Sequence, residues 1–204
     1  LEQYPPEFIE ALLMQEDKFF YTHAGVNFVA LVKAGWETYI KKSRRIGAST
    51  ITMQVAKLKY NLYTKNIPGK INQIIKAFYL ELCFSKDEIL EAYLNLAPVG
   101  GNVEGFETGA WYYFNKNIRQ LNLSEIIMLC VLPQNPIKRA PTTHRTPSEL
   151  ISARKILFET WIEKHPEDED KKIFMDMQMS VKCSFPNEAR HFTEMIYHEK
   201  KIKN

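Results

Sequence analysis

Two neighbouring acids and one basic segment are the parts of this sequence whose residue types could carry out chemistry. The acids, Glu16 and Asp17, stand just before the aromatic run Phe19-Phe20-Tyr21. Aromatic neighbours can partly desolvate a carboxylate and raise its pKa toward the range of a general base. Residues 41–86 hold ten Lys or Arg and one acid, a net charge of +9, although the whole chain carries only +3. This pairing predicts transfer chemistry in which a carboxylate removes a proton and a phosphate-type group departs.

The two acids should have different roles, because successive helical residues point in different directions. One of the two is expected to face a cleft as the base, and the other to act as a structural hydrogen-bond acceptor. The alternative is a solvated acidic pair at a helix end. His23 is interpreted as a structural residue that hydrogen-bonds the loop holding it, with Asp17 as the expected partner.

A cradle for an anion is predicted after residue 46. Residues 47–54 read Gly-Ala-Ser-Thr-Ile-Thr-Met-Gln, which predicts a helix capped by Ser49 or Thr50 whose free amides favour anions. Several lysines follow that could hold a diphosphate as point charges, namely Lys57, Lys65 and Lys70. The alternative is a solvated basic face.

The helix expected at 68–84 could supply a second carboxylate to this site. Gln73 and Glu81 lie eight residues apart, roughly two turns, and so share a similar face. Glu81 could orient a substrate or a metal there. It is equally well explained as an ion-pair partner of Lys86 or Lys57.

Helical spacing and capping signals predict a mainly α fold. The expected helices cover about residues 6–14, 28–40, 50–60, 68–84, 86–95, 105–114, 123 onward and 147–165, with a basic loop at 41–48. No alternating strand pattern of useful length is present. The acidic run 166–170 marks a change of composition, so we expect a domain at 1–165 and a linker-like segment at 166–204.

Composition argues against several classes of protein and site. Cys83 and Cys130 lie in apolar helical stretches and are expected to be buried thiols, and no C-x-x-C or comparable spacing predicts a metal site. The basic residues are not interleaved with aromatics, which argues against a nucleic-acid partner. There is no apolar run of 18 residues and no visible signal peptide, and the chain starts at Leu1, so we expect any membrane anchor to lie outside it.

Four sequence motifs, in order, resemble glycosyltransferase family 51, the peptidoglycan polymerase domain of class A penicillin-binding proteins and monofunctional transglycosylases. The first is Glu-Asp-x-x-Phe-x-x-His-x-Gly at 16–25, and the second is Gly-x-Ser-Thr-Ile-Thr-x-Gln at 47–54. The fourth family motif, Ser-Lys-x-x-Ile-Leu-Glu-x-Tyr-Leu-Asn, is met at 85–95. The fifth corresponds to Arg-Lys-Ile-Leu at 154–157. The match spans about residues 7–160.

Two departures from the family pattern are similar to its penicillin-binding protein 1C branch. Met53 precedes Gln54 where the family usually has Gln-Gln, and Gln73 replaces the usual Glu of the third motif. The segments 97–105 and 131–136 also resemble that branch. The spacing Ser-x-x-Lys occurs at 152–155, overlapping the fifth motif, and is not taken as a transpeptidase site, so no penicillin-binding activity is expected of this chain.

The resemblance implies a lysozyme-like α fold with a small membrane-facing lobe, acting at the periplasmic or extracytoplasmic face of the cytoplasmic membrane. It implies lipid II and the growing glycan chain as substrates, with the membrane surface and other cell-wall synthesis proteins as partners. The implied catalytic residues are Glu16, as the base, and Gln73. The implied substrate- and diphosphate-binding residues are Asp17, Arg45, Ser49, Thr50, Gln54, Lys57, Lys65 and Lys70.

No cofactor is required in this interpretation; assistance by Mg²⁺ or Mn²⁺ is the alternative, and Gln73 counts against it because it lacks a charge. Two other functions stay open at this point. One is a non-catalytic module that binds lipid II or the cell wall. The other is a peptidoglycan hydrolase, which would have no need of a diphosphate cradle.

Overall fold

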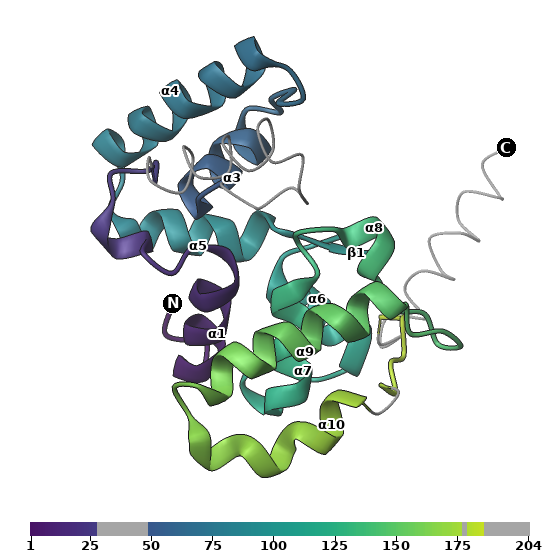
Figure 1. Ribbon diagram of the computed structural model, residues 1–204. Helices are drawn as coiled ribbons and strands as arrows, with labels where there is room; N and C mark the ends of the chain where they lie inside the picture. Colours follow the sequence, from purple (N-terminus) through teal and green to yellow (C-terminus); the bar gives the residue numbers. More distant parts are fainter. Residues whose placement is uncertain (28–48, 177–178, 186–204) are drawn as a thin grey trace, which may run out of the picture.

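The computed structural model describes residues 1–27, 49–176 and 179–185, and this part of the chain is mainly helical, as expected (Figure 1). The long helices are α1 (Pro6–Glu16), α3 (Ile51–Lys59), α4 (Ile67–Cys83), α5 (Lys86–Leu96), α6 (Phe106–Phe114), α7 (Leu123–Val131) and α9 (Ser148–Ile162). The short elements are η1 (Phe20–Thr22), β1 (Pro98–Gly100), β2 (Val103–Glu104), η2 (Ile118–Gln120), α8 (Pro136–Arg139), η3 (Pro166–Lys172) and α10 (Ile173–Asp176). The helix expected at 28–40 and the basic loop at 41–48, with Arg45, lie outside the described residues.

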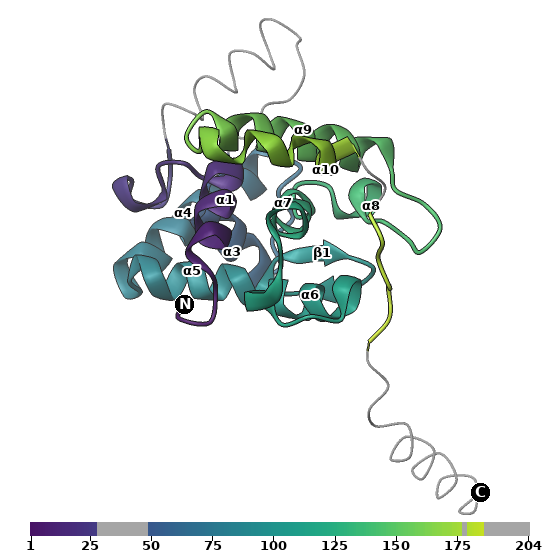
Figure 2. The same cartoon turned by 90° about the horizontal axis from the view of Figure 1, so that it is seen from below.

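The helices form two layers that meet at α5. Helices α3 and α4 pack on each other and on α5, and together they make the α3–α4 lobe (residues 49–84). On the other side, α1 packs on α7, and α7 packs on α9. Figure 2 shows α7 enclosed between α9 and α6. Because α1 ends beside both layers, its last residue reaches the junction between them.

The core explains why α7 is the central helix. Every residue from Glu125 to Val131 is buried, as expected for a helix surrounded by others. Capping boxes start two helices where the sequence predicts them. Ser85 caps α5 with Glu88, and Asn122 caps α7 with Glu125. Each cap sets the residue at which its helix begins, and so decides which side chains of α5 and α7 point into the core.

The two short strands were not expected from the sequence. β1 and β2 pair antiparallel between α5 and α6, and φ is positive both at Gly100, which ends β1, and at Gly101 in the turn. A side chain at Gly101 would come within 3.1 Å of the Tyr112 ring. Strands of three and two residues are too short to show alternation, which is why the pattern gave no signal.

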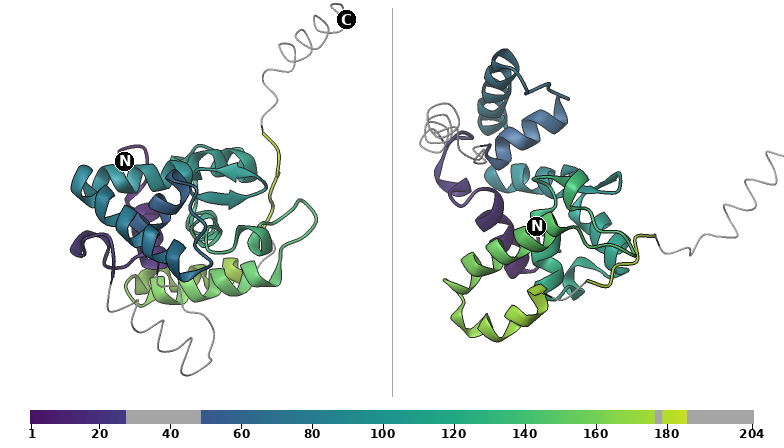
Figure 3. Two further views of the ribbon diagram at one scale, coloured as in Figure 1. Left: turned by 90° about the horizontal axis from the view of Figure 1, so that it is seen from above. Right: turned by 45° about the vertical axis from the view of Figure 1, so that its right-hand side comes forward.

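The segment after α9 packs back onto the fold. Trp161 donates from Nε1 to Asp168 Oδ2 at 2.8 Å, and Met175 and Val181 are buried. The extended stretch 179–185 then bonds to the end of α6 through Lys182 N to Tyr113 O, 2.8 Å (Figure 3). The first part of the linker-like segment therefore contributes to the core, and the boundary at residue 165 stays a prediction.

The cysteines are free thiols, and their burial differs from the expectation in one case. Cys130 is buried in α7, as expected, whereas Cys83 is exposed at the end of α4, so that expectation was wrong. Cys83 lies on the outer side of α4, which has no helix packed over it in the described residues. In the parts of the chain that the structure describes, none of the helices combines the length and apolarity needed to span a bilayer.

Candidate active site

Glu16 is the last residue of α1, and its carboxylate lies where α1, α3 and α5 meet. Gln54 of α3 donates from Nε2 to Glu16 Oε2 at 2.7 Å. Tyr93 of α5 donates from its hydroxyl to Gln54 Oε1 at 3.4 Å. The other carboxylate oxygen, Glu16 Oε1, is shielded from solvent and accepts no hydrogen bond from the described residues. That oxygen is therefore the one left to accept a proton.

Burial raises the pKa of the Glu16 carboxyl to about 7, the range that suits a general base at neutral pH. The Gln54 hydrogen bond and the Arg139 charge act in the opposite direction, while the Asp17 charge raises the pKa further. Burial and the nearby Glu16 also hold the pKa values of Tyr93 and Cys130 well above their usual range. The phenol and the thiol thus stay protonated while Glu16 exchanges its proton.

Asp17 faces away from Glu16 and ties two backbone segments together. Its Oδ2 accepts from Ile51 N, at the start of α3, at 3.0 Å. The His23 ring nitrogen Nε2 lies 3.0 Å from both Asp17 oxygens, which confirms the expected His23–Asp17 contact. Asp17 is buried and serves as the structural acceptor, so a binding role for it stays a prediction.

The N-terminus of α3 already binds the carboxylate of Asp17. Thr50 caps the helix by accepting from Met53 N at 3.2 Å, and it donates to Gly25 O at 2.5 Å. Ile51 N is taken by Asp17. The amides of Ile51 and Met53 are therefore satisfied within the protein, and anion binding by Thr50 at this helix start stays a prediction.

A positive cluster nevertheless lies next to this helix start. Lys70 of α4 donates from Nζ to Ser49 Oγ at 2.7 Å. Partial burial lowers the pKa of Lys70, and the charge of Lys57 lowers it further, which places the two ammonium groups in each other's field. Lys57 is exposed on α3, and Lys65 is exposed in the loop before α4. The structure thus joins Ser49, Lys57 and Lys70 in one cluster.

Gln73 lies deep inside the α3–α4 lobe rather than at its surface. Its side chain is 2% exposed and donates from Nε2 to Met53 O at 2.6 Å. The amide oxygen is buried without a partner in the described structure. Gln73 therefore holds the backbone of α3 one residue before Gln54, the residue that contacts Glu16, and its predicted catalytic role stays a prediction.

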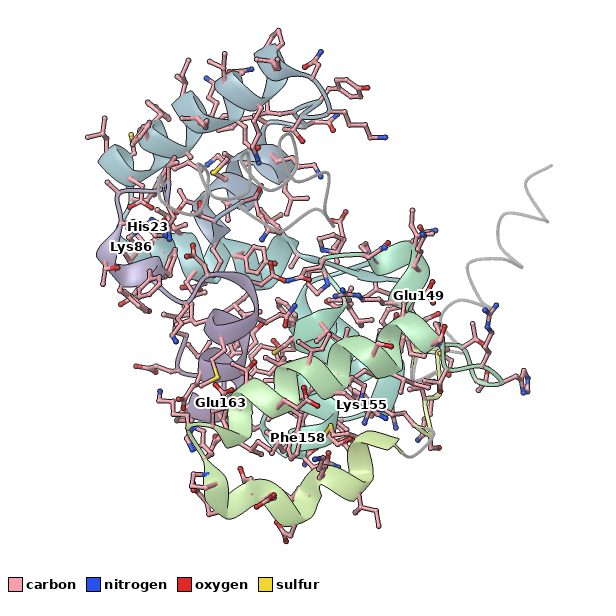
Figure 4. The ribbon with its side chains drawn as sticks, in the orientation of Figure 1. His23, Lys86, Glu149, Lys155, Phe158 and Glu163 are labelled. Carbon is pink, nitrogen blue, oxygen red and sulfur yellow. The ribbon has the colours of Figure 1, made fainter. Side chains whose placement is uncertain are left out.

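Glu81 belongs to an ion-pair network at the edge of the lobe. Lys86 Nζ lies 2.7 Å from Glu81 Oε1, which confirms the ion-pair interpretation. Lys86 also donates to His23 O at 2.6 Å, and Figure 4 shows these two residues side by side. Thr52 Oγ1 donates to the same Glu81 oxygen at 2.5 Å. Within the described residues, no group of three His, Cys, Asp or Glu is placed to hold a metal ion.

Two residues beside Glu16 were missed by the sequence reasoning. Arg139, the last residue of α8, donates from Nη1 to Val131 O at 2.6 Å and to Gln134 Oε1 at 3.3 Å. Gln134 Nε2 in turn donates to Gln15 O at 3.2 Å. Gln134 stands in the 131–136 segment already noted for its family resemblance, which was the available signal. For Arg139 no sequence pattern pointed toward Glu16.

Comparisons with known proteins agree with this fold. Residues 1–161 match the family model described as Transglycosylase. Penicillin-binding protein 1C of Escherichia coli K12 is 40% identical over 159 residues, 78% of this chain and 20% of that protein. Penicillin-binding protein 1A of Neisseria gonorrhoeae is 41% identical over 133 residues, 65% of this chain and 17% of that protein.

A solved structure shows the same overall fold. The crystal structure of penicillin-binding protein 1A from Haemophilus influenzae matches 98% of this chain with a TM-score of 0.51 at 19% identity. The match covers 20% of that chain. The present chain thus spans about a fifth of the length of these similar proteins.

Proposed function

This chain belongs to the transglycosylase family, and we propose that it is a peptidoglycan glycosyltransferase that polymerises lipid II into β-1,4 glycan chains. The observation that carries the proposal is the Glu16 carboxylate, desolvated and hydrogen-bonded on one oxygen only. The similarity to penicillin-binding proteins 1C and 1A supports the same reaction class. In this proposal the chain is an inverting transferase and not a hydrolase.

Glu16 acts as the general base of the transfer. It takes the proton from the 4-hydroxyl of the acceptor GlcNAc while that oxygen forms a bond to C1 of the donor MurNAc. The bond from C1 to the diphosphate breaks, and undecaprenyl diphosphate leaves with its electron pair. Inversion at C1 converts the α-linked diphosphate into a β-1,4 linkage.

The departing diphosphate needs positive charge, and the cluster of Ser49, Lys57 and Lys70 supplies it. Lys70 is fixed by its bond to Ser49, so it need not reorganise when charge develops on the leaving group. Lys65 and Arg45 complete the proposed set of cations. The role of this cluster favours a transferase, because hydrolysis of a glycan releases no diphosphate.

The α3–α4 lobe is the proposed membrane-facing part, at the extracytoplasmic surface of the cytoplasmic membrane. One side of α4 exposes large apolar side chains at helical spacing, and no described element packs over them. These residues are Ile67, Ile71, Ile75, Tyr79 and Leu82. Such a face fits the interface of a bilayer, where basic residues nearby would meet anionic headgroups. Lipid II, which is anchored in that bilayer, would then reach the site beside it.

Vesicle flotation tests the membrane contact. Ile71→Glu together with Ile75→Glu should weaken binding to vesicles of phosphatidylglycerol and phosphatidylethanolamine. Ile156→Glu is the matched control, because Ile156 is equally exposed but lies on α9, at the opposite side of the molecule. Equal binding by all three proteins would contradict the proposed orientation.

Polymerisation of labelled lipid II in detergent, with products resolved on a gel, tests the function itself. A general base contributes about 10²–10⁴-fold, so Glu16→Gln should lose most of the activity. Glu159→Gln, an exposed acid on α9, is the control and should polymerise normally. Normal polymerisation by Glu16→Gln would contradict the assignment of the base.

Two other outcomes separate the remaining functions. If the wild type and Glu16→Gln both bind lipid II and neither makes polymer, the result would support a non-catalytic binding module. Fragments released from intact glycan would support a hydrolase. Polymerisation that survives EDTA would agree with a reaction that requires no Mg²⁺ or Mn²⁺.

A further inference from the structure

The turn between α7 and α8 is built against the end of α1 that carries Glu16. Gln134 in this turn donates to the carbonyl of Gln15, the residue before Glu16. Arg139 fastens the same turn from the other side, since Nη1 donates both to Val131 O, at the end of α7, and to Gln134 Oε1. A continuous chain of hydrogen bonds therefore runs from Arg139 through Gln134 to the backbone beside Glu16.

The position of Arg139 is fixed by the short helix that it ends. Asn135 caps α8 and Pro136 starts it, so the four-residue helix has little freedom at its N-terminus. Arg139 N bonds to Asn135 O at 2.9 Å and completes the single turn. The guanidinium is thus placed by a closed turn and not by a free loop.

Two of the helices around Glu16 carry the charges that act on it, while α3 contributes the neutral side chain of Gln54. From α1, Asp17 contributes a negative charge, and from α8, Arg139 contributes a positive one. From α5 and α7, Tyr93 and Cys130 face the carboxylate in their neutral forms. Among these groups Arg139 is the cation, so its charge is the one that favours the ionised form of Glu16.

We propose that Arg139 is a positioning residue for the proposed transfer: it holds the α7–α8 turn against Glu16 and balances the charge of the ionised carboxylate. This inference rests on the proposed function, because it assigns Arg139 a role in the work of the base. Two consequences follow. Removing the charge should make Glu16 harder to ionise, and removing the fork of hydrogen bonds should loosen the turn.

Variants at and beside Arg139 separate these two effects. Arg139→Gln removes the charge but keeps an amide donor. Gln134→Glu places a counter-charge beside the guanidinium at an exposed position and also removes the donor to Gln15 O. Both should move Glu16 ionisation to higher pH. Arg139→Lys keeps the charge without the planar fork, so it should slow the reaction without moving its pH dependence. Lys138→Gln, the exposed neighbour on α8, is the charge-matched control.

Two measurements are made on each variant. The first is the rate of lipid II polymerisation from about pH 5.5 to about pH 9.5, and the second is a ¹³C NMR titration of Glu side-chain carboxyls without substrate. The Glu16→Gln protein identifies the Glu16 signal. In Arg139→Gln and Gln134→Glu, the midpoint of the Glu16 titration and the acid limb of the rate profile should both move to higher pH than in the wild type. Lys138→Gln should change neither.

The outcomes distinguish this inference from the proposed function. If the wild type polymerises lipid II and neither variant shifts the Glu16 titration, the role of Arg139 is refuted and the function stands. If the titration shifts while the wild type makes no polymer, the charge role stands and the proposed function fails. If Lys138→Gln shifts the Glu16 titration as far as Arg139→Gln does, the effect is one of net charge, and the specific role of Arg139 is refuted.

Discussion

Replacing Glu16 with Gln should remove activity and at the same time stabilise the protein at neutral and alkaline pH. Burial raises the pKa of Glu16 from an ordinary 4.5 to about 7 in the folded state. The group therefore stabilises the fold while protonated, fully so below its unfolded pKa. This contribution is lost as the pH rises through about 7, because the buried carboxylate must ionise.

The magnitude follows from the size of the shift. One pKa unit corresponds to about 1.4 kcal/mol, so ionised Glu16 should cost the folded protein about 3 kcal/mol at a pH well above 7. Gln at this position cannot ionise and can still accept from Gln54 Nε2. The variant should therefore match the wild type below about pH 4 and exceed its unfolding free energy by about 3 kcal/mol from about pH 7 upward.

Urea denaturation at several pH values measures this difference directly. Glu10→Gln is the control with the opposite sign, because the Lys164 hydrogen bond lowers the pKa of Glu10. Ionised Glu10 stabilises the fold above its unfolded pKa, so its Gln variant should lose stability at neutral pH and recover in acid. A Glu16→Gln advantage that does not change with pH would refute the reasoning on burial.

Three further substitutions test other parts of the site. Asp17→Asn should lower the unfolding free energy by about 1–3 kcal/mol in urea denaturation, because the buried Asp17–His23 pair loses an acceptor and a polar atom is left unsatisfied. Gly25→Ala should lower it by roughly 1–3 kcal/mol, since φ is +81° and the new Cβ would lie 2.7 Å from the Glu81 side chain. Gln73→Glu should cost roughly 1–3 kcal/mol and bring no large gain in lipid II turnover, because a carboxylate would face Met53 O.

Each of these predictions has a contrary result. Loss of less than about 1 kcal/mol in Asp17→Asn would mean that the pair is solvated. An unchanged Gly25→Ala protein would mean that the loop before residue 28 relaxes freely. A large rise in turnover for Gln73→Glu would mean that a second carboxylate at this position takes part in the reaction.

Local signals in the sequence were enough for most helices. Ser85 and Asn122 mark the starts of their helices, because each side chain accepts from the backbone N–H three residues later. Such capping does not depend on the rest of the fold. The β1–β2 pair and α8 depend instead on packing between distant segments. Ala140, for example, lies against Gly100, a contact that no local pattern can reveal. The same holds for Met175 and Val181, whose burial is set by α9 and α6.

The residue types of the candidate site could be predicted from the sequence, but the hydrogen bonds and contacts between them could not. Glu16, Gln54 and the lysines could be chosen because their chemistry suits the reaction. The sequence could not show that Asp17 takes the Ile51 amide, since this depends on how α1 meets α3. It also could not show Arg139, because a residue about 120 positions later reaches Glu16 only through the folded α7–α8 turn.

Helix α3 is a short element with attachments on several sides, and this limits how its length can change. Thr50 is bonded to Gly25, Met53 to Gln73 and Gln54 to Glu16, all within five consecutive positions. Inserting or deleting one residue there would rotate every later residue by about 100° and move it by about 1.5 Å. All bonds beyond the change would then point to the wrong neighbours. Engineered variants should accept a replacement at exposed Lys59 of α3 far more readily than any change in the number of residues.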